Sequence, residues 1–364
     1  MMKRNHLKLL QKSYAGKKVF VTGHTGFKGS WLTVWLEKLG ATVTGYALKP
    51  NTNPSLYKSI LAQLKFDSII ADIRDKEKLK REILSFQPDY IFHLAAYPLV
   101  LESYNQPVET FEVNTIGTAN VLEAVRHLTT PCSVVVITTD KVYHNQEWHY
   151  PYRENEMLGG YDPYSASKAA AEIVAASFRA SFFNPKDFSR HKKGIATARA
   201  GNVIGGGDYS KDRIVPDIFR ALKAGMPVPV RNPSAVRPWQ HVLEPLFGYL
   251  LLGAKLRQSG EKFSTAYNFG PLSTDNWLVI DLVRLAIKEW GAGSFETPKQ
   301  KQGPHEAQLL KLDINKAATE LEWMPQWTAH EAIQHTIDWY KKSLNRQADV
   351  YSLCLNNIES YENE

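Results

Sequence analysis

The 364-residue chain is poor in cysteine and contains no long uninterrupted hydrophobic segment. Its two cysteines, Cys132 and Cys354, are too few for a disulfide framework or a zinc cluster, which indicates a reducing environment. No stretch reaches the roughly 18–20 uncharged apolar residues that a membrane span needs. The basic N-terminus lacks the apolar core and the small-residue cleavage site of a secretory signal. We therefore expect a cytoplasmic protein with no membrane partner.

The sequence also lacks the patterns of a metal site and of a nucleic-acid-binding module. Its 11 histidines show no metal-ligand spacing, so no catalytic metal is expected. The net charge is +7, but the basic residues are mixed with 37 acids and do not gather beside a recognisable DNA- or RNA-binding motif. We expect no nucleic-acid partner, and part of the positive charge is available for an anionic small molecule.

What the chain does contain is an alternation of short apolar strands and amphipathic helices over its first 200 residues. Strands are expected at 18–21, 41–46, 68–71, 90–94, 133–138 and 195–200. Helices are expected between them at 30–39, 76–86, 114–128 and 165–183. This alternation predicts an α/β fold with a Rossmann-type doubly wound parallel sheet.

The rhythm changes near residue 200, where glycines, prolines and aromatic residues become frequent. We expect a dinucleotide-binding Rossmann domain over 17–200. A smaller substrate lobe, interleaved with the first domain, is expected mainly over 201–345. Residues 1–16 resemble a polar lead-in, and the residues after 345 resemble a weakly patterned polar tail.

A glycine-rich turn with GxxGxxG spacing follows the first strand and opens the first helix. Glycine permits the tight turn and lets the backbone approach a pyrophosphate, whose charge the helix N-terminus stabilises. Its strand–turn–helix setting makes the motif specific for a dinucleotide. The expected contacts are Gly23, Thr25, Gly26, Phe27, Lys28 and Gly29.

The acid that usually binds the adenosine 2′-hydroxyl is absent from the end of the second strand, where the sequence is Gly45-Tyr-Ala-Leu-Lys49. Lys28 or Lys49 could meet a 2′-phosphate, which would favour NADP, or both could be solvated surface lysines. Asp72 could contact adenine or cap a helix. These residues by themselves leave the choice between NAD and NADP open.

A second motif, Tyr164-Ser-Ala-Ser-Lys168, places a phenol and an ammonium on one face of a helix. A nearby ammonium lowers the pKa of a phenol, so Tyr164 could accept a proton from a sugar hydroxyl while a hydride leaves for a nicotinamide. The motif follows a buried strand that ends in Thr138-Thr139-Asp140. Together with the glycine-rich turn, this combination predicts a redox active site.

These motifs resemble the extended short-chain dehydrogenase/reductase superfamily over roughly residues 17–340. The matching stretches are GHTGFKGSWL from Gly23, HLAAYPLV from His93, VNTIGTANVLEAV from Val113, YSASK from Tyr164 and RAGNVIGGGD from Arg199. Within the superfamily the chain is most similar to nucleotide-sugar 4,6-dehydratases, and to those that act on CDP-glucose. The Asp140–Lys141 pair and RPWQHVLEPL from Arg237 point to that subgroup. Relatives that act on dTDP-glucose or GDP-mannose typically carry Glu at the position of Lys141.

The resemblance implies an NAD-dependent hydro-lyase that makes a 4-keto-6-deoxy sugar for deoxysugar and lipopolysaccharide O-antigen synthesis. Hydride leaves sugar C4 while Tyr164 takes the 4-hydroxyl proton, water is eliminated across C5 and C6, and hydride returns to C6. Asp140 would protonate the departing 6-hydroxyl, which requires a raised pKa, and Thr139 would bond the 4-oxygen. Lys141 either has a pKa lowered by burial or orients Asp140 while another group removes the C5 proton.

The resemblance also implies further contacts and a homodimer that forms through the helix carrying Tyr164. It adds cofactor contacts from Asp72, Ile73, Leu94, Ala95, Ala96, Asn114, Thr138, Tyr164 and Lys168. It implies a substrate contact from Asn202. Arg213, Arg231 and Arg237 are candidate diphosphate ligands because guanidinium binds phosphate oxygens in pairs, or else surface arginines, and the family-like surroundings favour Arg237. His305 is a further candidate substrate contact.

Three alternatives remain open from the sequence. A nucleotide-sugar 4-epimerase would share Tyr164 and Lys168 but needs no acid to expel water, so Asp140 argues for elimination. A dehydratase could act on another nucleotide hexose. A non-enzymatic NAD-binding sensor would need no base, and the intact Tyr164/Lys168 pair argues against it.

Overall fold

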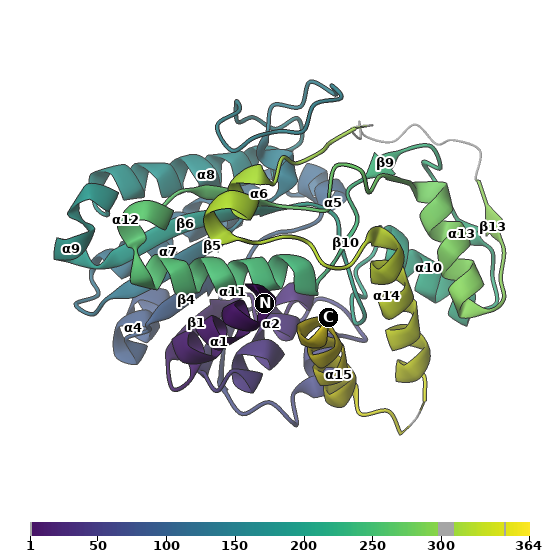
Figure 1. Ribbon diagram of the computed structural model, residues 1–364, viewed down its shortest axis with the longest axis horizontal. Coiled ribbons are helices and arrows are strands. Elements are labelled where there is room, and N and C mark those ends of the chain that lie inside the picture. Colours follow the sequence, from purple (N-terminus) through teal and green to yellow (C-terminus); the bar gives the residue numbers. More distant parts are fainter. Residues whose placement is uncertain (1, 298–308, 346) are drawn as a thin grey trace.

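A sheet of seven parallel strands forms the centre of the protein, in a computed structural model that describes residues 2–297, 309–345 and 347–364. The strand order is β11-β6-β5-β4-β1-β2-β3 (Figure 1). The strands are β1 Lys18–Thr22, β2 Thr42–Ala47, β3 Asp67–Ile70, β4 Tyr90–His93, β5 Cys132–Ile137, β6 Lys193–Ala200 and β11 Ala266–Phe269. The order reverses between β1 and β4, which is where doubly wound sheets bind ligands. The predicted fold class is confirmed.

Helices cover both faces of the sheet and create two hydrophobic cores. Along β5, Val134 and Val136 enter one core and Val135 and Ile137 the other, because successive side chains of a strand point to opposite faces. The first core is covered by α4 Lys76–Phe86, α7 Gly117–Arg126 and α8 Pro163–Ser181. The second is covered by α1 Met2–Tyr14, α2 Phe27–Lys38, α11 Leu243–Gln258 and α15 Val350–Asn363.

Short elements connect these layers. On the side of α8 lie α5 Val100–Asn105, α6 Pro107–Phe111 and the π-helical turn η1 Glu112–Ile116, which leads directly into α7. The remaining short helices are α3 Leu56–Ile60, η2 Asp140–Val142, η3 Pro185–Asp187, α9 Phe188–His191, α12 Gly260–Phe263 and η4 Ala317–Leu321.

The chain after β6 forms a group of helices and two-residue strands at one end of the sheet (Figure 1). Its helices are α10 Ile214–Lys223, α13 Val279–Trp290 and α14 Ala329–Ser343. Its small strands are β7 Val203–Ile204, β8 Val228–Pro229, β9 Val236–Arg237, β10 Gln240–His241, β12 Trp277–Leu278 and β13 Phe295–Glu296, paired as β10-β7, β12-β9 and β13-β8. The same half of the chain also supplies β11 and α11 to the central sheet.

Two predictions about the chain ends are wrong. Residues 2–14 are a helix rather than a polar lead-in, with Leu10 and Tyr14 fully buried and the Tyr14 hydroxyl donating to the Leu250 carbonyl at 2.7 Å. The segment after 345 contains α15, which buries Cys354, Ile358 and Tyr361. That spacing places three side chains on one helical face, and the face packs against α2.

Two boundary shifts matter for the site. The helix α2 begins at Phe27 rather than at residue 30, so Lys28 and Gly29 lie in its first turn. The helix α8 begins at Pro163, so Tyr164 lies in the first turn of that helix. Both motifs singled out in the sequence therefore sit at helix N-termini beside the carboxyl ends of parallel strands.

Candidate active site

The glycine-rich turn packs directly against the residues that follow β4. Gly23 has φ of +78°, and a Cβ on it would lie 2.6 Å from the Ala95 nitrogen. The Ala95 nitrogen donates to the Thr22 hydroxyl at 3.1 Å. A Cβ on Gly29 would collide with the Gly23 carbonyl oxygen. These two glycines are thus required by the turn itself, and Gly23 lets Leu94 and Ala95 lie beside it.

The N-terminus of α2 has no side-chain cap. Its N-cap residue is Gly26, which is exposed and offers no side-chain acceptor to the first amides of the helix. Unpaired amides at a helix N-terminus, with the helix dipole behind them, favour an anion. The neighbouring Thr25 hydroxyl donates to the Leu48 carbonyl at 2.8 Å and fixes the turn against the end of β2. The residues present therefore fit the pyrophosphate of a dinucleotide.

The end of β2 has no carboxylate, as the sequence indicated. Tyr46 is buried there, and its hydroxyl donates to the Asp72 carbonyl at 2.9 Å. The Asp72 carboxylate accepts from the Arg74 guanidinium at 2.7 Å and from the Arg74 amide at 2.8 Å. Ile73 is buried against Gly117. The Asp72 carboxylate therefore binds Arg74 and does not cap α4, because the N-cap residue of that helix is Asp75.

Lys28 does not lie near the end of β2. Its ammonium is 3.5 Å from the Tyr249 hydroxyl, and it interacts electrostatically with Arg213, Asp140, Lys168 and Lys141. Burial, together with those cations, lowers the pKa of Lys28 to about 7. The idea that it is a solvated surface lysine is wrong, whereas Lys49 is exposed.

The carboxyl end of β5 carries the predicted acid. Asp140 is only 1% exposed, and its Oδ1 accepts from the Thr139 hydroxyl at 2.9 Å and from the Lys141 ammonium at 3.2 Å. The Lys141 ammonium also lies 3.5 Å from the Asn202 side-chain oxygen. The other oxygen, Oδ2, faces Gly201, where a Cβ would come within 3.0 Å of it. The fold thus brings Thr139, Asp140, Lys141 and Asn202 together.

Tyr164 and Lys168 project from the first turns of α8. The helix is capped by Asp162, which accepts from the Ser165 amide at 2.9 Å, and Pro163 occupies its first turn. The buried Lys168 ammonium donates to the Ile137 carbonyl at 3.0 Å and so joins α8 to the end of β5. Asn114 in η1 donates to the Ser167 hydroxyl at 2.8 Å and holds the other side of the helix.

The pKa values of this pair differ from the simple sequence argument. Burial raises the pKa of Tyr164, although Lys141, the Thr139 hydroxyl and Arg213 act to lower it. Burial likewise lowers the pKa of Lys168 to about 8, although Glu172 acts to raise it. The sequence argument considered the ammonium and not the desolvation. Among the cations that favour the Tyr164 phenolate, Lys141 has the largest effect.

The predicted diphosphate ligands are distributed over the second half of the chain. Arg213, at the N-cap of α10, pairs with Asp208 at 3.0 Å and reaches the site electrostatically. Arg231 pairs with Asp212 at 3.4 Å. Arg237 lies on β9, and its guanidinium donates to the Val236 carbonyl at 3.0 Å. His305 lies outside the residues that the structure describes.

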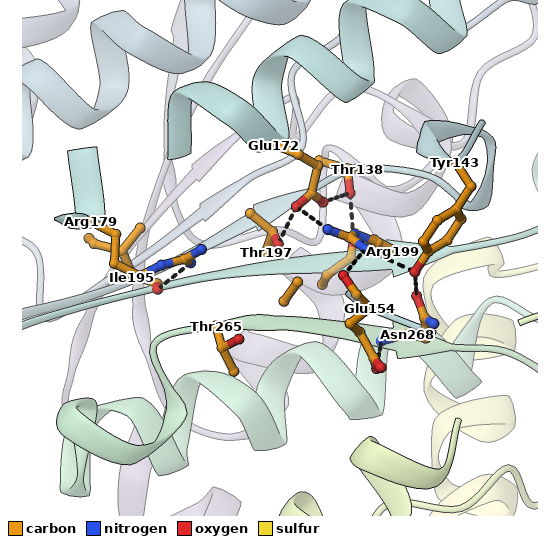
Figure 2. A network of polar contacts seen from close by, with 12 residues as sticks. Thr138, Tyr143, Glu154, Glu172, Arg179, Ile195, Thr197, Arg199, Thr265 and Asn268 are labelled. Carbon is orange, nitrogen blue, oxygen red and sulfur yellow. Dashed lines mark hydrogen bonds and ion pairs between the residues drawn. The ribbon is translucent and has the colours of Figure 1, made fainter. Parts of the chain in front are cut away.

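Sequence reasoning missed a buried polar network that lies behind these groups. Within the core, Thr138 and Arg199 each donate a hydrogen bond to the Glu172 carboxylate (Figure 2). Glu172 follows Lys168 by four residues, and this helical spacing is the one signal that could have pointed to it.

The residues that the structure describes contain neither a cluster of metal-ligating side chains nor a membrane-spanning helix. Within 2–297, 309–345 and 347–364, no group of three or more His, Cys, Asp or Glu side chains could hold a metal ion. Among the helices that the structure describes, none is long and apolar enough to cross a lipid bilayer. Both cysteines are buried and unpaired.

The chain resembles characterised proteins over most of its length. It is 49% identical over 328 residues to a CDP-glucose 4,6-dehydratase of Salmonella typhimurium, with 90% of this chain and 91% of that protein covered. Two solved structures share the fold at lower identity. A dTDP-glucose 4,6-dehydratase from Streptomyces venezuelae, solved with NAD and TYD, has a TM-score of 0.74 at 24% identity and covers 90% of this chain and 98% of its own. A UDP-glucose 4-epimerase from Stenotrophomonas maltophila, solved with NAD and a UDP-pentose, has a TM-score of 0.78 at 22% identity and covers 91% of this chain and 100% of its own.

The family comparison agrees with the site. Residues 20–336 match the family described as GDP-mannose 4,6 dehydratase. That range contains the glycine-rich turn, the Asp140–Lys141 pair and the Tyr164/Lys168 motif. On this match and on the 49% identity above, the chain belongs to the GDP-mannose 4,6-dehydratase family of the extended short-chain dehydrogenase/reductase superfamily.

Proposed function

We propose that this protein is an NAD-dependent CDP-glucose 4,6-dehydratase that forms CDP-4-keto-6-deoxyglucose and water. The observation that carries the proposal is the buried acid Asp140, held by Thr139 and Lys141 in the same site as Tyr164. A base for oxidation and an acid for elimination are two of the groups that a dehydratase needs, together with a further group that accepts the C5 proton. The 49% identity to a CDP-glucose 4,6-dehydratase supports the choice of reaction and of nucleotide.

The dinucleotide is proposed to lie along the glycine-rich turn, with the uncapped α2 amides at its pyrophosphate. When bound, its nicotinamide ring accepts a hydride and later returns it. We propose NAD because the solved dehydratase and epimerase of the same fold contain NAD. The buried Tyr46 at the end of β2 and the position of Lys28 away from it agree with a cofactor that lacks a 2′-phosphate.

The side chains divide the reaction between them. The Tyr164 oxygen accepts the proton of the sugar 4-hydroxyl, and Lys141 and the Thr139 hydroxyl favour the phenolate that this requires. Asp140 gives a proton to the departing 6-hydroxyl. Both donors to Asp140 meet Oδ1, which leaves Oδ2 as the oxygen available to the substrate. Lys168 bonds the end of β5 and keeps Tyr164 in place through α8.

Lys141 acts in this proposal as a cation that orients Asp140. Its ammonium donates to the Asp140 carboxylate and lies near the Asn202 amide oxygen, contacts that a charged lysine makes. Of the two alternatives drawn from the sequence, these contacts support the orienting role.

We further propose that Asn202, Arg213, Arg231 and Arg237 bind the nucleotide diphosphate end of the substrate. Arg213 supports this most directly, because it acts electrostatically on Lys28 and on Tyr164. A cluster of Lys28, Lys141, Lys168 and Arg213 is an environment that favours diphosphate anions.

Incubation of the purified protein and NAD with CDP-glucose, dTDP-glucose, GDP-mannose and UDP-glucose tests the function. The expected result is a product from CDP-glucose that has lost the mass of one water and shows the alkaline absorbance of a 4-keto-6-deoxy sugar. Conversion of another of these nucleotide sugars in preference would refute the choice of nucleotide. A product of unchanged mass with an inverted C4 centre would replace the dehydratase with a 4-epimerase, whose fold this chain also shares.

We propose that two copies of the chain associate through α8, α6 and η1 in the cytoplasm. Three apolar side chains on these neighbouring elements are exposed: Val108 is 70%, Ile116 53% and Ile173 60% exposed. Apolar exposure on adjacent helices is typical of an interface. The variant Ile173→Glu is expected to sediment as a monomer, and an unchanged sedimentation mass would count against this surface.

A further inference from the structure

A carboxylate and a guanidinium are buried together directly behind the catalytic groups. Glu172 lies on α8 one helical turn after Lys168, and Arg199 lies near the carboxyl end of β6. Both side chains are almost completely buried and form an ion pair at 2.9 Å (Figure 2). Removing two charges from water costs free energy that the attraction seldom returns, so a buried ion pair is weak evidence of a contribution to stability.

Glu172 connects three structural elements. Its Oε1 accepts from the Thr138 hydroxyl at 2.5 Å, and Thr138 immediately precedes Thr139 and Asp140. Its Oε2 accepts from the Thr197 hydroxyl at 2.7 Å and from the Arg199 guanidinium at 2.9 Å. The carboxylate therefore fastens the helix that carries Tyr164 to the strand end that carries the acid. Attraction to Arg199 and these hydrogen bonds outweigh burial and lower the pKa of Glu172, so it stays charged.

Arg199 extends the network to the far side of Asp140. Its guanidinium donates to the Tyr143 hydroxyl at 2.9 Å and to the Glu154 carbonyl at 3.0 Å. Tyr143 follows η2, the turn that contains Asp140 and Lys141, and its own hydroxyl donates to the Asn268 side chain at 2.7 Å. Figure 2 shows the Tyr143 and Glu172 side chains on either side of the Arg199 guanidinium. The segment 138–143 is thus held at both ends by one ion pair.

The charge of Glu172 also faces Lys168. The titratable groups that interact with Lys168 are Lys28 on α2, His93 on β4 and Glu172 on α8 itself. Burial lowers the pKa of His93 to about 3, so that ring is neutral. Burial lowers the pKa of Lys168, and attraction to the Glu172 carboxylate acts to raise it.

We propose that Glu172 and Arg199 are positioning residues for the dehydratase reaction. Their ion pair aligns segment 138–143 with α8, and the Glu172 carboxylate keeps Lys168 charged. Neither side chain touches the reacting atoms. The proposal rests on the proposed function where activity is measured, and cofactor binding tests it separately.

The experiment compares three variants of the full-length protein with the wild type. Glu172→Gln removes the charge and keeps the shape. Glu172→Gln/Arg199→Met removes both charges, so that no unpaired buried charge is left to unfold the protein. Thr197→Val is the matched control, because it deletes one hydrogen bond to Glu172 and leaves the charge in place.

The readout is the pH profile of kcat/KM on CDP-glucose. With its anion removed, Lys168 should lose its proton at lower pH, so the alkaline limb should move down by about one pH unit in both Glu172 variants. We expect kcat to fall by about tenfold or more with a smaller change in KM, because alignment is lost rather than substrate contact. Thr197→Val should keep the wild-type alkaline limb.

The titration of Lys168 can also be followed without the substrate. Calorimetry measures the affinity for NAD as a function of pH. The Glu172 variants should lose affinity at lower pH than the wild type. If affinity and activity keep the wild-type pH dependence in the double variant while only the melting temperature changes, the pair is structural and the proposal is refuted. If the Glu172 variants lose NAD affinity at lower pH than the wild type, but the wild type does not convert CDP-glucose, the proposed function has failed and the positioning role stands.

Discussion

Replacing Asp140 by asparagine separates the two chemical steps proposed for this site. Asparagine keeps the shape but cannot give a proton to the departing 6-hydroxyl. The oxidation at C4 depends on Tyr164 and should survive, whereas water loss should slow by about 10²–10⁴-fold, the usual contribution of a general acid. That range corresponds to about 2.7–5.5 kcal/mol of transition-state stabilisation.

The structure indicates that the fold will tolerate this change. Asp140 accepts one hydrogen bond from Thr139 and one from Lys141, and the Lys141 side chain is a third exposed and can turn to water. Losing charge-assisted hydrogen bonds of this kind costs about 1.5–3 kcal/mol, toward the low end where a partner regains solvent. This is less than the roughly 5–15 kcal/mol that stabilises a typical domain.

Rapid mixing of Asp140→Asn with CDP-glucose provides the assay. We expect the absorbance of reduced nicotinamide to rise at close to the wild-type rate and then persist, while the 4-keto-6-deoxy product forms slowly. Product formation within about threefold of the wild type would remove Asp140 from the mechanism. An equal loss of hydride transfer and product would show that the carboxylate serves the first step instead.

The control is Asp89→Asn. Asp89 pairs with Arg257 at 2.9 Å and accepts from the Lys18 amide at 3.1 Å, at the amino end of the sheet. It therefore measures the cost of losing a carboxylate in a comparable ion pair, far from the carboxyl edge that carries the site. Its melting temperature should fall while its kinetics stay at the wild-type values.

Three further perturbations follow from the same contacts. Tyr164→Phe should lower the rate of reduced-nicotinamide formation in a single turnover by about 10²-fold or more, with CDP-glucose binding retained in calorimetry, and a wild-type rate would contradict its role as the base. Below pH 7 folding must bury a charged Lys28 that the unfolded chain keeps in water, because burial lowers its pKa to about 7. Lys28→Met should therefore raise the melting temperature more at pH 6 than at pH 10, and equal shifts at both pH values would refute the burial of this charge. Ile358→Ala should reduce the free energy of unfolding by about 2–5 kcal/mol in urea denaturation, and an unchanged midpoint would contradict the docking of α15.

The amino-acid sequence determined the fold class and the two motifs of the site. Strand and helix periodicities of 2 and about 3.6 residues are local properties. A continuous apolar run such as 133–138 therefore predicts a buried parallel strand without reference to the rest of the chain. The glycine-rich turn and Tyr164/Lys168 have fixed spacing within single elements, and the turn is specified by its own backbone, as Gly23 and Gly29 show. The helix face of α15 was also present as a spacing, but three apolar positions in a polar segment were too few to identify it.

Tertiary structure alone decided how these groups act on one another. Whether the pKa of Tyr164 rises or falls depends on the desolvation contributed by several elements, which no local spacing contains. The ion pair of Glu172 with Arg199 joins residues from α8 and β6 that the sequence separates by 27 positions. Lys28 lies in a motif for pyrophosphate yet belongs to the cluster around Asp140. Local sequence determines elements and motifs because these depend on near neighbours, whereas burial and Coulomb interactions depend on distances through space and exist only once the chain is folded.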